Sequence, residues 1–182
     1  MPVRIVGSER VFSGRLISLD LVRLETPRGE AVREVVRHPG AVVLIPFDGS
    51  RVYLVRQFRP SVSSRLLELP AGTLEPGESP EDCAARELEE ETGLRASELR
   101  RLFSAYPTPG YCDEVLHFFL ATGLERGEAR PEEDEEIEVV ALPPDEAVEE
   151  VFSSEALDMK TALGLLWLRA NLDLLLDRRA PP

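Results

Sequence analysis

Three glutamates, Glu87, Glu90 and Glu91, stand close together in a stretch with a helical pattern. At about 100° per residue, they project from one helix face within a fan of roughly 100°. Three neighbouring carboxylates repel one another, and a hard divalent cation such as Mg²⁺, which takes oxygen ligands, removes that repulsion. The spacing therefore indicates a metal site, although an acidic run is more often a solvated helix face.

The flanking residues predict a helix over 79–92. Ser79 suits the N-cap, Pro80 suits the first helical position and Gly93 suits the end. The preceding loop, 71–77, carries two glycines and a proline, so it can approach a ligand closely and offer backbone carbonyls.

A longer pattern runs from Gly72 to Leu94. Gly72 is followed six residues later by Glu78, and then by the run Arg86 to Leu94, R-E-L-E-E-E-T-G-L. This fills every fixed position of the Nudix box, G-x5-E-x7-R-E-U-x-E-E-x-G-U with U aliphatic, which is a strong signal at fixed spacing. The chain therefore resembles Nudix hydrolases. The resemblance implies metal-dependent cleavage of a diphosphate linked to another group, with Mg²⁺ as the cofactor and Mn²⁺ or Zn²⁺ as possible substitutes.

The box residues receive roles from this resemblance. We expect Glu87 and Glu91 to be the main metal ligands, with the Ala71 carbonyl completing the coordination. Glu90 is expected to bind a further ion or to support the first, and it is also a candidate catalytic base. Glu78 and Arg86 are expected to form a structural ion pair.

Segments outside the box resemble ADP-ribose pyrophosphatases over about residues 40–170. They are 55–60, 70–78 and a proline, Pro109, fifteen residues past Leu94, with Asp113-Glu114 after it. The resemblance implies hydrolysis of ADP-ribose to AMP and ribose 5-phosphate, with Pro109, Gly110 and Glu114 at the substrate. A Pro-Gly turn alone would also explain Pro109.

Two further roles concern the diphosphate and the attacking water. Arg59 could bind phosphate oxygens bidentately, although an arginine at a strand end more often forms a surface salt bridge. The acidic stretch 132–136 could supply the general base, because a carboxylate beside bound metal can take a proton from water. In the resembling enzymes this base is a glutamate from the same loop, so Glu133 and Glu135 are the candidates.

Composition limits the partners. The chain of 182 residues carries a net charge of −13, which argues against nucleic acid or an anionic membrane as a partner. No long apolar run or leader is seen, so no membrane span is expected. Two lone cysteines, Cys83 and Cys112, suit the reducing cytoplasm.

The order of strand and helix patterns predicts an α/β fold. Strand patterns fill 41–47, 51–58, 66–69, 99–106, 115–121 and 137–142, with 41–47 and 51–58 expected to form a hairpin through Asp48-Gly49. A short helix opens at Pro143, and Ser153 or Ser154 is expected to cap a longer one reaching about Asp177. The resemblance implies a Nudix-type α/β/α sandwich with a mixed sheet over residues 41–182.

Residues 1–40 read as short strands with too few apolar residues for a core of their own. We therefore expect a small N-terminal β segment that packs on the rest of the chain or on a second subunit. The resembling enzymes are homodimers that exchange such a segment, so Arg33 or Arg37 of a partner is expected near the substrate.

Three other readings stay open. The same chemistry could serve FAD, NADH, a sugar nucleotide or a diadenosine polyphosphate. Alternatively, the domain could bind a nucleotide and signal without cleaving it. Intact Glu87, Glu90 and Glu91 argue against this alternative, because a protein that only binds needs no metal cluster. A purely structural acidic domain would leave the spacing of the box unexplained.

Overall fold

The computed structural model describes residues 2–127 and 137–177. In this part the strands are β1 (Arg4–Ser13), β2 (Ser18–Thr26), β3 (Gly29–Arg37), β4 (Ala41–Pro46), β5 (Val52–Arg59), β6 (Ser64–Glu68), β7 (Ala71–Thr73), β8 (Leu94–Ala105), β9 (Leu116–Arg126) and β10 (Glu138–Leu142), and the helices are α1 (Pro80–Thr92), α2 (Pro144–Phe152) and α3 (Met159–Leu176). They form three sheets, ordered β1-β2-β3, β10-β5-β6 and β7-β4-β9-β8.

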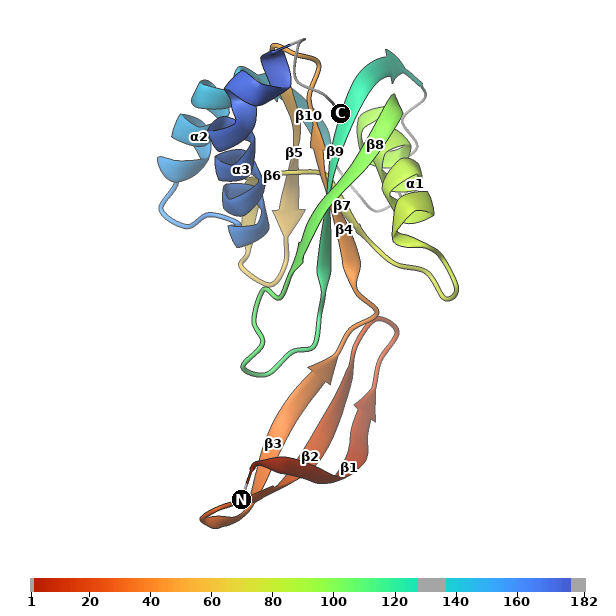
Figure 1. The fold of residues 1–182 in the computed structure, drawn as a ribbon, viewed down its shortest axis with the longest axis vertical. Coiled ribbons are helices and arrows are strands. Elements are labelled where there is room, and N and C mark those ends of the chain that lie inside the picture. The colour runs from red at the N-terminus through yellow and green to blue at the C-terminus, as the bar shows by residue number, and fades with distance from the viewer. Residues whose placement is uncertain (1, 128–136, 178–182) are drawn as a thin grey trace.

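The sheet that contains β4 is mixed and covered on both faces, which confirms the predicted α/β layering. β4 pairs in parallel with β9 and antiparallel with β7. Helix α1 covers one face, while α2 and α3 lie on the other side with the sheet of β5 and β6 (Figure 1). Every residue of β4 is buried, and its side chains alternate between the two cores: Val43 and Ile45 face the α3 side, and Val42 and Leu44 face α1.

The N-terminal strands form an antiparallel sheet that projects away from the rest of the protein (Figure 1). It meets the rest at a neck, where the Val36 amide donates to the Tyr111 carbonyl and the Asp113 amide donates to the Val36 carbonyl. The Arg37 guanidinium reaches both Asp20 on β2, at 2.8 Å, and Asp113, at 2.9 Å. These contacts hold the sheet to the loop between β8 and β9, residues 106–115, which we call the neck loop.

Two expected local features are wrong. The Asp48-Gly49 turn forms, but β4 and β5 do not make a hairpin ladder, because both edges of β4 are taken by β7 and β9 and β5 joins the sheet with β10 and β6. Helix α3 is not capped by Ser153 or Ser154. Its N-cap is Asp158, whose carboxylate accepts the Thr161 amide at 2.9 Å.

No helix in residues 2–127 and 137–177 is long and apolar enough to cross a membrane.

Candidate active site

Helix α1 starts and ends where its capping residues predict. The Ser79 hydroxyl accepts the Asp82 amide at 3.1 Å, and Gly93 adopts a left-handed conformation with φ of 66°. Ala84 and Leu88 are buried against β4 and β9. Because one face of the helix is fixed to the sheet, the glutamates beside that face turn toward β7 and the loop after it.

Helix α1 and this loop line a cavity of about 1010 Å³. All three predicted metal-binding glutamates, Glu87, Glu90 and Glu91, line it, as does Ala71. Gly72 also lines it, and a Cβ built there would lie 1.8 Å from the carboxyl carbon of Glu87. A larger residue at this position would therefore displace the Glu87 carboxylate from its place beside the backbone.

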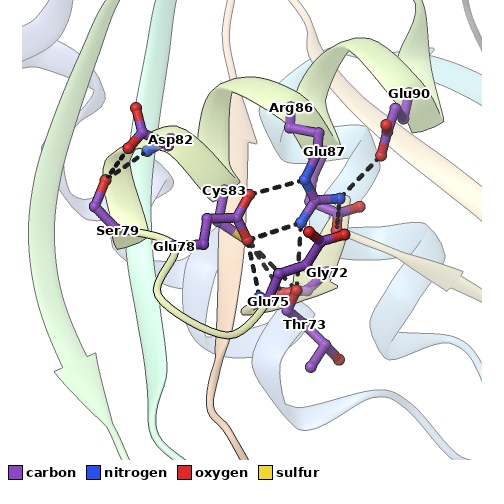
Figure 2. A network of polar contacts seen from close by, with 10 residues as sticks. All are labelled: Gly72, Thr73, Glu75, Glu78, Ser79, Asp82, Cys83, Arg86, Glu87 and Glu90. Carbon is purple, nitrogen blue, oxygen red and sulfur yellow. Dashed lines mark hydrogen bonds and ion pairs between the residues drawn. The ribbon is translucent and has the colours of Figure 1, made fainter.

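The Arg86 guanidinium binds three of the glutamates that line the cavity (Figure 2). Its Nε donates to Glu78 at 2.9 Å, and its Nη1 donates to Glu87 at 2.7 Å and to Glu90 at 3.0 Å. These bonds lower the pKa of Glu78 to about 2 and raise the pKa of Arg86. The expected Glu78–Arg86 pair is thus present, and it ties the loop to the helix.

The three glutamates differ in freedom. The Glu91 carboxylate accepts the Ala71 amide at 3.0 Å, and Glu91 is only 6% exposed. Side-chain exposure is 13% for Glu87 and 41% for Glu90. Glu87 and Glu91 are therefore largely buried at the cavity wall, while Glu90, although bonded to Arg86, is more open to solvent.

The donor set fits a hard divalent cation, because the cavity lining gathers several carboxylates. In residues 2–127 and 137–177, no three acidic, histidine or cysteine side chains converge as a ready-made cluster. The Arg86 guanidinium instead contacts both Glu87 and Glu90. A bound cation would therefore share these two carboxylates with Arg86.

Arg59, the predicted diphosphate ligand, lines the same cavity. Its Nε and Nη2 each donate to Glu68 at 2.7 Å. Glu68 is 1% exposed and also accepts from the Lys160 ammonium, which in turn contacts Asp158 at 3.0 Å. Burial opposes ionisation of Glu68, but the two cations outweigh it and lower its pKa. This pairing fixes the direction in which Arg59 reaches the cavity.

The other predicted substrate residues lie away from this cavity. The Arg33 Nη1 donates to the Val32 carbonyl at 2.9 Å on β3, outside the cavity wall. Pro109 and Gly110 are exposed in the neck loop, and a Glu114 oxygen lies 3.6 Å from His38 Nδ1. Glu133 and Glu135 lie outside the described residues.

Sequence reasoning missed two contributions. Glu68 could have been found, because a charged residue inside the run Leu66-Leu67-Glu68-Leu69 must be paired when the strand is buried. Arg15 and Leu16, between β1 and β2, also line the cavity. No motif marks these two, since only the arrangement of the N-terminal sheet brings them there.

Comparison with known proteins agrees with this site. The family model described as NUDIX domain matches residues 36–162. The ADP-ribose pyrophosphatase of Bacillus subtilis is 42% identical over 170 residues, covering 91% of this chain and 92% of that protein. A GDP-mannose pyrophosphatase of Escherichia coli is 35% identical over 178 residues, covering 90% and 91%. A crystal structure of an ADP compounds hydrolase superposes with a TM-score of 0.81 at 24% identity, covering 96% of each chain, and so supports the fold.

Nudix hydrolases generally require a divalent cation, which suits the carboxylates of the cavity. With the complete box on α1 and its preceding loop, and with these matches over most of its length, the chain belongs to the Nudix hydrolase family.

Proposed function

We propose that this protein hydrolyses the diphosphate bond of ADP-ribose to give AMP and ribose 5-phosphate, using Mg²⁺. The observation that carries the proposal is that Glu87, Glu90, Glu91 and Arg59 all line one cavity. The 42% identity to an ADP-ribose pyrophosphatase supports this substrate.

In this proposal Glu87, Glu91 and the Ala71 carbonyl hold the metal. When bound, Mg²⁺ would polarise a phosphoryl oxygen and acidify a water. The Ala71 amide keeps Glu91 in place, and Arg86 keeps Glu87 in place. Arg59 offers its remaining Nη1 to the diphosphate, because its other two nitrogens are held by Glu68.

We assign the general base to Glu133 or Glu135, with Glu90 as the next candidate. Replacing each of the first two by glutamine should reduce kcat far more than it changes KM, because the base acts on the water rather than on substrate binding. Full activity in both single variants and in the double variant would move the base to Glu90, which is the most exposed of the three predicted metal-binding glutamates.

The decisive experiment measures diphosphate cleavage with Mg²⁺ over ADP-ribose, FAD, NADH, sugar nucleotides and diadenosine polyphosphates, with an added phosphatase that releases phosphate from the phosphomonoester products. Glu87→Gln and Glu91→Gln should lower turnover by orders of magnitude, because each removes a charged ligand while keeping helix propensity. Glu89→Gln is the matched control: Glu89 lies on the same helix but pairs with Arg95 at 2.6 Å. Near-wild-type turnover in Glu87→Gln or Glu91→Gln would refute the metal assignment.

A second candidate substrate is a sugar nucleotide such as GDP-mannose. It is favoured by the 35% identity to a GDP-mannose pyrophosphatase over nearly the full chain. The ratio of kcat/KM for ADP-ribose to kcat/KM for GDP-mannose separates the two, because discrimination depends on transition-state binding.

We also propose that residues 1–40 form a dimerisation segment exchanged between subunits, beside a Nudix domain over 41–182. Among the described residues before Gly40, only Asp20 and Val22 are buried. Large apolar side chains on the N-terminal sheet are exposed, among them Ile5, Phe12 and Val32 at 69%, 54% and 53%. A partner subunit would cover them, and Arg33 or Arg37 of that partner would then approach the substrate.

The cytoplasm is the compartment that we propose. Both cysteines are free thiols, which suits a reducing environment.

A further inference from the structure

The described side chains that line the cavity carry more negative charge than their arginines can balance. Its lining includes five glutamates, Glu75, Glu78, Glu87, Glu90 and Glu91, and three arginines, Arg15, Arg59 and Arg86, in the part of the chain that the structure describes. A substrate with two phosphates must therefore find its positive partners among few groups.

Two of these arginines are already engaged with the protein's own carboxylates. Arg86 serves Glu78, Glu87 and Glu90, and Arg59 is bound bidentately by buried Glu68. Much of their charge is offset before any substrate arrives. Within residues 2–127 and 137–177, Arg15 makes no hydrogen bond or ion pair and is exposed. All of its donors are therefore available to a ligand, whereas two of the three guanidinium nitrogens of Arg59 are bonded to Glu68.

The loop that carries Arg15 is held in a defined place. The Gly14 amide donates to the Ile17 carbonyl at 2.8 Å, directly after the last β1–β2 pair, Ser13 with Ser18. Farther along the same strands, Asp20 contacts both Arg10 and Arg37, and Arg37 continues to Asp113 in the neck loop. The Arg10–Asp20–Arg37–Asp113 chain thus links the hairpin to the domain that holds the cavity.

We propose that Arg15 is a substrate-binding residue whose guanidinium contacts the phosphate-bearing part of the substrate, opposite the metal-binding helix. This rests on the proposed function, since it names a determinant of diphosphate binding in the same site. A guanidinium matches two phosphate oxygens at once, and water exclusion by the bound substrate strengthens the contact. The role concerns binding, so it acts on affinity and not on the chemical step.

The test compares full-length wild type, Arg15→Ala and Arg15→Lys, with Arg51→Ala as the matched loss of an exposed arginine outside the cavity wall. KM and kcat are measured for ADP-ribose with Mg²⁺, and Kd for ADP-ribose is measured by calorimetry in EDTA, where no turnover occurs. Arg15→Ala should raise KM and Kd about tenfold and leave kcat nearly unchanged, as expected for one charge-assisted contact. Arg15→Lys should recover part of the affinity through its charge, and Arg51→Ala should match wild type.

The salt dependence provides a second readout. Raising ionic strength should weaken ADP-ribose binding to wild type more than to Arg15→Ala, because the variant has already lost the screened contact. A purely structural role for Arg15 would lower thermal stability without changing this slope. Unchanged Kd and KM in Arg15→Ala, or a fall in kcat alone, would overturn the proposal.

Failure of the proposed function would be recognised separately. If wild type cleaves another diphosphate derivative and not ADP-ribose, the substrate assignment fails, and the Arg15 variants are compared on the derivative that is cleaved. A raised KM there still supports a diphosphate contact by Arg15, and an unchanged KM rejects it.

Discussion

Replacing Glu68 by glutamine should destabilise the fold severely although the two side chains have almost the same shape. Glu68 is 1% exposed and accepts three charge-assisted hydrogen bonds, two from Arg59 at 2.7 Å and one from Lys160. A bond to a charged group contributes about 1.5–3 kcal/mol and a neutral one about 0.5–1.5 kcal/mol. Glutamine removes the anion that Arg59 and Lys160 share and turns one carboxylate oxygen into an NH₂ group that faces a cation, so the expected loss is the about 3–5 kcal/mol typical of breaking a buried ion pair.

The assay is urea and thermal unfolding at pH 7, followed by circular dichroism. For a chain of this length, each kcal/mol shifts Tm by about 2–4 °C, so a loss of about 3–5 kcal/mol predicts a drop of roughly 6–20 °C. Glu125→Gln, at an exposed position on β9, is the matched control and should change stability by less than about 0.5 kcal/mol.

The pH dependence supplies an independent check. The folded-state pKa of Glu68 is lowered from its ordinary 4.5, because the bonds from Arg59 and Lys160 outweigh burial. The stabilisation by ionised Glu68 is therefore complete above pH 4.5 and is lost as pH falls through the lower, folded-state pKa. The stability gap between wild type and Glu68→Gln should narrow over that range. A gap below about 1 kcal/mol at pH 7, or one that does not narrow in acid, would refute the reasoning.

Three further predictions follow from the site and the neck. Gly72→Ala should reduce kcat at least about tenfold, because the added methyl would overlap the Glu87 carboxylate, 1.8 Å from its carboxyl carbon; steady-state kinetics with wild-type kcat would contradict this. Arg86→Met should cost about 2–4 kcal/mol in urea unfolding without metal and less with saturating Mg²⁺, because it leaves Glu87 and Glu90 without their shared cation; equal losses in both conditions would argue against a shared site. Light scattering should find a dimer for the full chain and a monomer for a chain that starts at Gly40, whereas a fully active full-length monomer at micromolar concentration would disprove the exchanged segment.

Local sequence was sufficient to place helix α1 and its carboxylates. Its capping residues, Ser79 and Gly93, act within one turn of the helix ends, so their effect can be read without tertiary information. The Glu78–Arg86 pair likewise joins a loop to the helix that follows it immediately.

Pairings between segments that are distant in the sequence cannot be predicted from local residue patterns. A turn at Asp48-Gly49 predicts that two strands reverse direction, but it does not tell whether they share a sheet, and β4 finds better partners in β7 and β9. The start of α3 was misplaced because Ser153, Ser154 and Asp158 are all good caps in isolation. Asp158 is the N-cap in the structure, where its carboxylate also accepts a hydrogen bond from the Thr161 hydroxyl at 2.5 Å and contacts Lys160.

The charge of the cavity connects the metal, the arginines and the N-terminal sheet. Counting the described side chains of its lining, five glutamates and three arginines give a formal charge of −2, which one divalent cation cancels. The bare cavity should therefore repel a diphosphate, and bound metal removes that repulsion without supplying a surplus of positive charge. Additional positive charge must come from donors that are not bonded to the protein's own carboxylates, and Arg15 is the residue that we propose for this role. The hairpin that carries Arg15 is tied to the loop after β8 through Asp20, Arg37 and Asp113, so the role that we propose for Arg15 would couple the N-terminal sheet to substrate binding.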